Sequence, residues 1–368
     1  MSESRLLQPL KVGDLQLSHR IVMAPLTRFR ADEQHVPLPI AEEYYAQRAS
    51  VPGSLLIAEA TFISKRAGGY SNVPGIWSPE QIGAWRKITD AVHRKGSYIF
   101  LQLWALGRVA VPSVAQSEGF EVVSPSPVAL NAGDPPPKEL DGDGIQGFVD
   151  DYRQAAWNAM EAGFDGVEIH GAGGYLIDQF TQDNCNQRAD EYGGSIENRS
   201  RFILEVVRAV VEAVGPGRVG VRLSPWQRFQ GMRIEDPIPQ FTHVITELRH
   251  IGLAYLHLIE ARVNGNVDST DTDKIHPFVE AFDDAAPIIL AGGYKANSAK
   301  ILLDGEFKDK RILVAFGRHY ISNPDLPFRI RQGIELTPYK RSTFYTPMSA
   351  LGYADYPFSE EFESLVAA

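Results

Sequence analysis

The chain repeats one pattern eight times: a short apolar segment is followed by a longer segment with the spacing of an amphipathic helix. Apolar segments that do not alternate with polar residues are typical of strands buried on both faces, as in parallel sheets. Eight strand–helix units predict a (β/α)8 barrel, the TIM-barrel fold. The predicted strands are residues 21–25, 55–58, 97–103, 166–169, 219–223, 254–259, 287–291 and 312–316.

Two segments depart from the repeat. Residues 6–17 contain Leu and Val around Gly13-Asp14, which predicts an N-terminal β-hairpin before the first barrel strand. Residues 110–140, after the third strand, are rich in Pro, Ser and Ala and predict a long irregular excursion that could act as a lid. Helical periodicity resumes at Ile145, so residues 1–368 are interpreted as one barrel domain.

A doubly wound open sheet is the alternative fold for alternating strands and helices. That fold would require a glycine fingerprint after the first strand. The residues there, Ala24-Pro25-Leu26-Thr27, do not form one. The sequence therefore favours the closed barrel.

The charge balance restricts the partners. The formal net charge is −10, which argues against binding to nucleic acid or to an anionic membrane, so an anionic ligand would need a local positive site.

Cys185 is the single cysteine, which excludes an internal disulfide and cysteine-based metal sites. The first eleven residues lack a signal-peptide pattern, and no apolar run approaches the roughly 20 residues of a membrane span. We expect a cytoplasmic protein without a metal centre.

The ligand site of a barrel lies at the carboxyl ends of its strands. The residues predicted at those ends are Thr27, Ala60, Gln102, His170, Arg222, Glu260, Gly292, Gly293, Gly317 and Arg318. Barrels often hold a phosphate after strands seven and eight, where Gly293 and Gly317 allow close approach and Arg318 supplies charge. The sequence therefore predicts a phosphate-bearing ligand.

Two of these side chains suggest what else the ligand carries. Gln102 can both donate and accept hydrogen bonds, which suits a heterocycle with alternating N–H and C=O groups. Arg222 would stabilise negative charge that develops on such a ring. Flavin mononucleotide (FMN) satisfies both requirements, and the residues alone leave a sugar phosphate open.

The fourth strand ends in a segment with proton-transfer chemistry. After residues 166–169 the chain turns through Gly171 to Gly174, where small residues allow a sharp bend beside a flat ligand. His170 and Tyr175 flank this turn. An imidazole can donate or accept a proton near neutral pH, and a phenol can protonate a carbanion. The two residues are the predicted catalytic pair.

Several motifs together resemble the old yellow enzyme family, in order and at matching spacing from about residue 5 onward. They are Ala24-Pro25-Leu26-Thr27-Arg28, Gln102-Leu103-Trp104, Asp190-Glu191-Tyr192-Gly193-Gly194-Ser195-Ile196-Glu197-Asn198-Arg199, Arg222-Leu223-Ser224-Pro225, Gly317-Arg318 and Ile321-Ser322-Asn323-Pro324-Asp325-Leu326. The fungal and plant branch, which includes 12-oxophytodienoate reductases, is the most similar.

The resemblance implies an FMN-dependent ene-reductase. NADPH or NADH would reduce FMN, hydride would pass from flavin N5 to the β-carbon of an enone or enal, and Tyr175 would protonate the α-carbon. By position, the flavin contacts would be Pro25, Leu26, Thr27, Ala60, Gln102, Arg222, Gly292, Gly293, Gly317 and Arg318. The substrate contacts would be His170, Gly173, Tyr70, Trp104, Phe229 and Tyr345. Either a monomer or a homodimer is compatible with this reading.

One position departs from the family pattern. The family holds the substrate carbonyl with a His paired to an Asn or His three residues later, and here the pair is His170 and Gly173. Glycine has no side chain to donate a hydrogen bond, and loss of one such donor elsewhere slows a reaction by roughly 10²–10³. An alternative function is therefore altered chemistry, as in an isomerase or a flavin oxidase.

Two other functions are disfavoured. A flavin-free lyase or aldolase would need a Schiff-base lysine or a metal cluster, and neither marks the strand ends. The His170–Tyr175 pair argues against a non-catalytic barrel.

Overall fold

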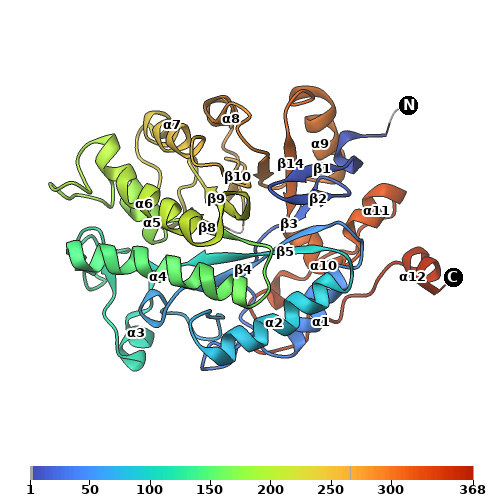
Figure 1. The fold of residues 1–368 in the computed structure, drawn as a ribbon, viewed down its shortest axis with the longest axis horizontal. Helices are drawn as coiled ribbons and strands as arrows, with labels where there is room; N and C mark the ends of the chain where they lie inside the picture. The colour runs from blue at the N-terminus through green and yellow to red at the C-terminus, as the bar shows by residue number, and fades with distance from the viewer. Residues whose placement is uncertain (1–2, 266, 368) are drawn as a thin grey trace.

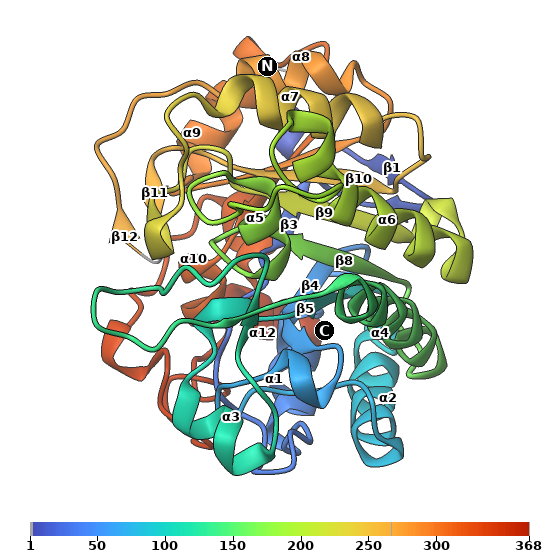
Figure 2. The same cartoon turned by 90° about the vertical axis from the view of Figure 1, so that its left-hand side faces the viewer.

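A computed structural model describes residues 3–265 and 267–367, and its centre is a closed barrel of eight parallel strands. Every predicted strand is present, which confirms the (β/α)8 fold, and Figures 1 and 2 show helices surrounding the barrel. The second strand runs on to Phe62, past the predicted end at Ala58, with a register shift between Ala58 and Thr61. In closing order the strands are β3 (Ile21–Met23), β4 (Leu55–Phe62), β5 (Tyr98–Trp104), β8 (Gly166–Gly171), β9 (Val219–Leu223), β10 (Tyr255–Ile259), β13 (Ile288–Ala291) and β14 (Ile312–Phe316).

The surrounding helices follow the predicted periodicity. They are α1 (Ile40–Arg48), α2 (Pro79–His93), α4 (Gly142–Glu161), α6 (Ile196–Val214), α7 (Pro237–Leu248), α8 (His276–Phe282), α9 (Ala296–Ile301) and α11 (Leu326–Gln332). α2 begins with a capping box, in which Gln81 N–H donates to the Ser78 side chain and the Gln81 side chain accepts from Ser78 N–H. The apolar faces of these helices pack on the outside of the barrel and form the largest buried cluster.

The predicted N-terminal hairpin is also present. It covers the end of the barrel at which the strands begin, opposite their carboxyl ends. β1 (Leu10–Val12) and β2 (Leu15–Leu17) pair in antiparallel fashion around Gly13-Asp14. Val12 and Leu17 are fully buried in one cluster with side chains from the barrel interior, among them Leu55 and Leu313. The interior is therefore filled at its amino end, and the carboxyl end is the open one.

The excursion after the third strand is more regular than predicted. Residues 110–140 contain α3 (Pro112–Glu118) and a parallel pair of two-residue strands, β6 (Val123–Ser124) and β7 (Lys138–Glu139). Arg188 donates hydrogen bonds to the carbonyls of Pro125 and Leu140 and so fixes both sides of this segment. No residue of 110–140, all of which the structure describes, lines the main cavity, but Ala110 and Val122 pack in the same cluster as Trp104 and Tyr175. A lid role for this segment stays a prediction.

Three further short helices and one pair of short strands had no clear sequence signal. They are α5 (Leu176–Thr181), the pair β11 (Val263–Asn264) and β12 (Val267–Asp268), α10 (Arg318–Ser322) and α12 (Glu360–Ala367). The first three lie at the carboxyl ends of barrel strands, beside the cavity described below. Among residues 3–265 and 267–367, no helix is long and apolar enough to cross a membrane.

Candidate active site

One cavity of about 870 Å³ lies at the carboxyl ends of the barrel strands. Its lining includes every residue that the sequence predicts as a catalytic, cofactor or substrate contact, drawn from strands and loops that are far apart along the chain. These residues are Pro25, Leu26, Thr27, Ala60, Tyr70, Gln102, Trp104, His170, Gly173, Tyr175, Arg222, Phe229, Gly292, Gly293, Gly317, Arg318 and Tyr345. Glu260, also predicted at a strand end, is not part of the lining. The fold therefore brings the predicted cofactor and substrate residues into one space.

The end of the cavity next to β13 and β14 is built for an anion. Arg318 follows β14, and its guanidinium holds the carboxylate of Asp268 with Nη2 2.5 Å from Oδ1. Gly293 has a φ of +67°, and a Cβ built there would lie 3.6 Å from the same Asp268 oxygen. A Cβ would fit at this distance, so it is the positive φ that favours glycine here. The Asp268 side chain occupies the position that the sequence predicts for phosphate.

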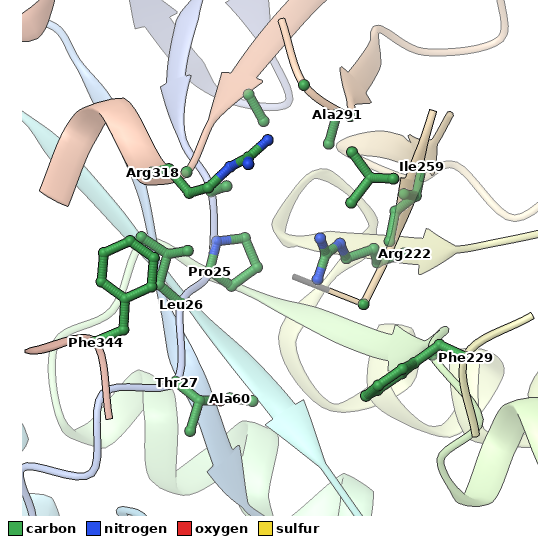
Figure 3. A pocket seen from close by; sticks show the side chains of 18 of the residues that line it. Pro25, Leu26, Thr27, Ala60, Arg222, Phe229, Ile259, Ala291, Arg318 and Phe344 are labelled. Atoms are coloured by element: carbon green, nitrogen blue, oxygen red, sulfur yellow. The ribbon is translucent and has the colours of Figure 1, made fainter. Parts of the chain in front are cut away.

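A flat wall with polar groups forms the middle of the cavity. Figure 3 shows the guanidinium groups of Arg318 and Arg222 reaching into the pocket from different sides, with Pro25 between them. Arg222 lies on β9 directly opposite His170 on β8 and His257 on β10. The Nε of Arg222 is buried and has no hydrogen-bond partner within the described chain. An acceptor on a bound ligand would satisfy it.

Two buried residues beneath this wall, Glu168 and His257, were not predicted from the sequence. Glu168 on β8 accepts a hydrogen bond from Gln102 Nε2 at 2.6 Å, and its other oxygen lies 2.8 Å from Nδ1 of His257. Both Glu168 and His257 are fully buried. Glu168 lies two positions before His170, so strand alternation places both on the same face, and that alternation could have identified it.

The predicted catalytic pair, His170 and Tyr175, lies in an aromatic corner of the cavity. The rings of His170 and Tyr175 are 5.0 Å apart between centroids at an interplanar angle of 71°. The indole of Trp104 stacks over His170 at 6.0 Å and meets Tyr175 edge-on at 4.7 Å. His170 Nδ1 is buried without a hydrogen-bond partner in the described chain. Packing of the three rings thus holds the imidazole of His170 and the hydroxyl of Tyr175 beside the same part of the cavity.

Burial fixes the protonation of both groups. Burial, with Arg222 and His257 nearby, holds the pKa of His170 well below its usual range, so its imidazole is neutral. Burial, reinforced by Tyr70, raises the pKa of Tyr175 above its ordinary value. Its hydroxyl therefore remains protonated at neutral pH and can donate a proton.

Gly173 has a conformation that suits glycine, at φ +68°. Its N–H donates to Ser224 Oγ at 2.8 Å. A Cβ built on Gly173 would lie 3.3 Å from Cε2 of Tyr175 and 3.9 Å from Cε1 of His170. A side chain at this position would therefore project between the two catalytic rings, where a second carbonyl donor would be needed.

The remaining aromatic residues form the upper wall and rim. Phe29 links Tyr70 and Tyr345 through edge-to-face contacts at 6.4 Å and 5.8 Å. Phe229 and Tyr345 are 37% and 46% exposed, so they form the mouth and are not buried wall residues. The sequence analysis missed Phe29, Phe344 and Gln230, which also line the cavity.

Two buried arginines hold the C-terminal segment that carries Phe344 and Tyr345. Arg28 Nε and Arg30 Nη1 each donate to the carbonyl of Phe344 at 3.0 Å. Arg28 Nη2 also donates to the carbonyl of Gly352 at 2.6 Å. The loop after β3 therefore fixes a chain segment more than 300 residues away against the cavity mouth.

Comparison with known proteins identifies this arrangement. A sequence model of the NADH:flavin oxidoreductase / NADH oxidase family matches residues 5–337. The chain belongs to this family. It is similar to chanoclavine-I aldehyde reductase fgaOx3 of Penicillium roqueforti (strain FM164), at 56% identity with 99% of each chain covered. It is also similar to the NADP-dependent oxidoreductase lnbE of Aspergillus flavus, at 55% identity with 99% and 98% of the chains covered.

A solved relative confirms the fold and the resemblance to old yellow enzymes. The structure of Old Yellow Enzyme from Pichia sp. AKU4542 matches with a TM-score of 0.90 and 38% identity, covering 97% of this chain and 94% of that one. The chain is thus an FMN-dependent NAD(P)H oxidoreductase. The cavity of this flavin oxidoreductase fits FMN, because Arg318 already holds an acidic group and the buried Nε of Arg222 lacks an acceptor.

Replacement of Arg318 should weaken the cofactor site selectively. A hydrogen bond to a charged group contributes about 1.5–3 kcal/mol, so Arg318→Ala should raise the Kd for FMN about 10- to 100-fold. Binding of riboflavin, which lacks the phosphate, should change little. Asp268→Asn should tighten FMN binding, because it removes the carboxylate that competes for Arg318. Fluorescence titration of the apoprotein measures both ligands, and an equal loss for FMN and riboflavin would contradict the assignment of the phosphate site.

Proposed function

We propose that this flavin oxidoreductase reduces the C=C bond of α,β-unsaturated aldehydes or ketones. The chemistry that bound FMN supplies is hydride transfer, from NADPH or NADH to flavin N5 and from there to the β-carbon of the substrate. The observation that carries the proposal is the His170–Tyr175 pair, whose rings lie 5.0 Å apart within the cofactor cavity. One ring can hold a carbonyl oxygen while the other delivers a proton beside it.

Each residue of the pair has a separate task. The neutral imidazole of His170 donates a hydrogen bond to the substrate oxygen and stabilises the negative charge that develops there. The protonated hydroxyl of Tyr175 gives its proton to the α-carbon, and the resulting phenolate is later reprotonated from solvent. Hydride at the β-carbon and a proton at the α-carbon together add two hydrogens across the double bond.

The other lining residues would bind the two ligands. For FMN these are Pro25, Leu26, Thr27, Ala60, Gln102, Arg222, Gly292, Gly293, Gly317 and Arg318, at the strand ends. Tyr70, Trp104, Phe229 and Tyr345 would bound the substrate. The names of the relatives fgaOx3, an aldehyde reductase, and lnbE, an NADP-dependent oxidoreductase, favour an unsaturated aldehyde as substrate and NADPH as reductant.

A steady-state experiment tests this proposal. The FMN-loaded protein is incubated without oxygen with NADPH and a small unsaturated aldehyde or ketone, and products are identified by mass spectrometry. The proposal predicts one equivalent of saturated carbonyl product for each NADPH consumed. Formation of the alcohol with the double bond intact would contradict it.

Gly173 supports a second candidate, altered chemistry in the same site. Without a second donor, the substrate carbonyl can adopt another pose, and the net reaction would be isomerisation of the double bond or oxidation by the flavin. The retained proton donor Tyr175 favours net reduction. An isomerase would return a product of unchanged mass with no net NADPH consumption, and a flavin oxidase would require oxygen.

Restoring a donor at position 173 should strengthen the carbonyl site. Gly173→Asn should lower the Kd of a para-substituted phenol about tenfold and raise enone kcat/KM by a similar factor, because a second hydrogen bond reaches the ligand oxygen. Asparagine tolerates a φ near +68°, although Tyr175 must shift by a few tenths of an ångström to accept the new Cβ.

Gly173→Ala is the matched control for this variant, because it adds the same Cβ at the same positive φ without an amide. It should give no gain in phenol binding or turnover. If Gly173→Asn loses both, the glycine serves a different substrate pose and the assignment of the carbonyl position is wrong.

A further inference from the structure

A buried carboxylate, Glu168, lies with a buried imidazole, His257, beneath the proposed cofactor wall, and the proposed reaction uses neither of them. The carboxylate of Glu168 and the imidazole of His257 are both 0% exposed, and neither residue lines the cavity. A carboxylate buried in a barrel interior is destabilising unless it is paired, and apolar side chains of similar volume would pack there at lower cost. The presence of this charge therefore calls for an explanation other than packing.

The hydrogen bonds of Glu168 reach one residue of the cavity lining and one buried residue beside Arg222. Its Oε1 accepts from Nε2 of Gln102, which lies opposite it in the strand register of β5 and β8. Its Oε2 lies 2.8 Å from Nδ1 of His257, the residue opposite Arg222 in the register of β9 and β10. One carboxylate on β8 is thus hydrogen-bonded to side chains of β5 and β10, with Arg222 of β9 next to His257 in the register.

The protonation states within this group are well defined. Burial alone would raise the pKa of Glu168, but His257, Arg222 and Gln102 outweigh burial and keep it below its usual range. Burial lowers the pKa of His257, so the ring is neutral and donates its Nδ1 hydrogen to Glu168. The group therefore carries one negative charge, on Glu168, close to the positive charge of Arg222.

Two consequences follow for the cavity. With one amide hydrogen of Gln102 committed to Glu168, its carbonyl oxygen has a fixed orientation as an acceptor. The negative charge of Glu168 also partly offsets that of Arg222 in a low-dielectric environment, where such an effect is large. Both the direction of hydrogen bonding and the electrostatic potential at the cavity floor depend on this one side chain.

We propose that Glu168, held by His257, is a positioning residue that orients Gln102 and offsets the charge of Arg222, and thereby sets the affinity for FMN and its reduction potential. This inference rests on the proposed cofactor site and is independent of which substrate is reduced. Reduced FMN carries more negative charge than oxidised FMN. Loss of the Glu168 charge should therefore favour the reduced form.

The test is Glu168→Gln in the FMN-loaded protein, with Glu59→Gln as the matched control. Glu59 is also a buried barrel glutamate, on β4, but it accepts hydrogen bonds from Arg28 and Tyr45 and makes none with Gln102 or Arg222. We expect Glu168→Gln to favour reduced over oxidised FMN about tenfold. For a two-electron couple this is a rise of about 30 mV in the midpoint potential. Glu59→Gln should leave the potential unchanged.

A conservative variant separates charge from geometry. Glu168→Asp keeps the charge but is too short to reach Gln102 and His257 together, so FMN should bind about tenfold more weakly at a potential near that of the wild type. If Glu168→Gln does not fold, the FMN affinity of Glu168→Asp still tests the proposal. Wild-type FMN affinity in Glu168→Asp, or a wild-type potential in a folded Glu168→Gln, would overturn the proposal. Neither measurement uses substrate, so failure here is distinguishable from failure of the proposed ene-reductase function.

Discussion

Tyr175→Phe should slow formation of the saturated product about 10²- to 10⁴-fold, the usual contribution of a positioned general acid. The variant removes the one hydroxyl that burial keeps protonated beside His170. It preserves the ring that packs edge-on against Trp104 at 4.7 Å. The loss should therefore fall on proton delivery, and reduction of the flavin by NADPH should remain within about twofold of the wild-type rate.

Stopped-flow spectroscopy separates these two half-reactions in the Tyr175→Phe protein. Tyr152→Phe is the control, because Tyr152 is a fully buried tyrosine on α4 whose hydroxyl has no hydrogen-bond partner in the described chain and which does not line the cavity. That control should affect neither step. An unaltered rate of saturated product in Tyr175→Phe would remove the proton donor from the mechanism.

His170→Ala should lower kcat/KM for an enone about 10²- to 10³-fold. Because Gly173 contributes no side chain, His170 is the principal donor available to the substrate oxygen among the residues we assign to the carbonyl position. Removal of one preorganised donor in other enzymes has an effect of this size. Binding of a para-substituted phenol, followed through the visible flavin spectrum, should weaken in the same variant.

A double-mutant comparison shows whether positions 170 and 173 share the substrate oxygen. If Gly173→Asn supplies a second donor, His170→Ala should be less damaging in that background than in the wild type. Equal losses in both backgrounds would mean that the asparagine points elsewhere. A His170→Ala protein with full activity would show that the carbonyl is bound by other groups.

The sequence predicts the barrel because eight apolar segments recur with helical segments between them, and the strand ends then identify the cavity lining. Contacts between strands depend on register, which the sequence does not specify. Glu168 could be placed on the same face as His170, but its contact with His257 appears only when β8, β9 and β10 are aligned. That is why the buried charged group was missed.

Long-range contacts account for the other differences between sequence and structure. Asp268 reaches Arg318 through a hairpin of two-residue strands, which is too short for a periodic signal. Arg28 and Arg30 hold a segment that follows them by more than 300 residues. The excursion at 110–140 is more regular than its proline content predicts, and Arg188, a residue from a distant part of the chain, donates hydrogen bonds to two of its carbonyls.

A single-turnover experiment in deuterated water tests the central claim most directly. The FMN-loaded protein is reduced with one equivalent of NADPH under nitrogen and then mixed with cyclohexenone. We predict that the flavin absorbance returns in step with saturated ketone that carries deuterium at the α-carbon, at a rate that Tyr175→Phe lowers. Flavin that stays reduced, or a product in which a double bond has only moved, would contradict the account.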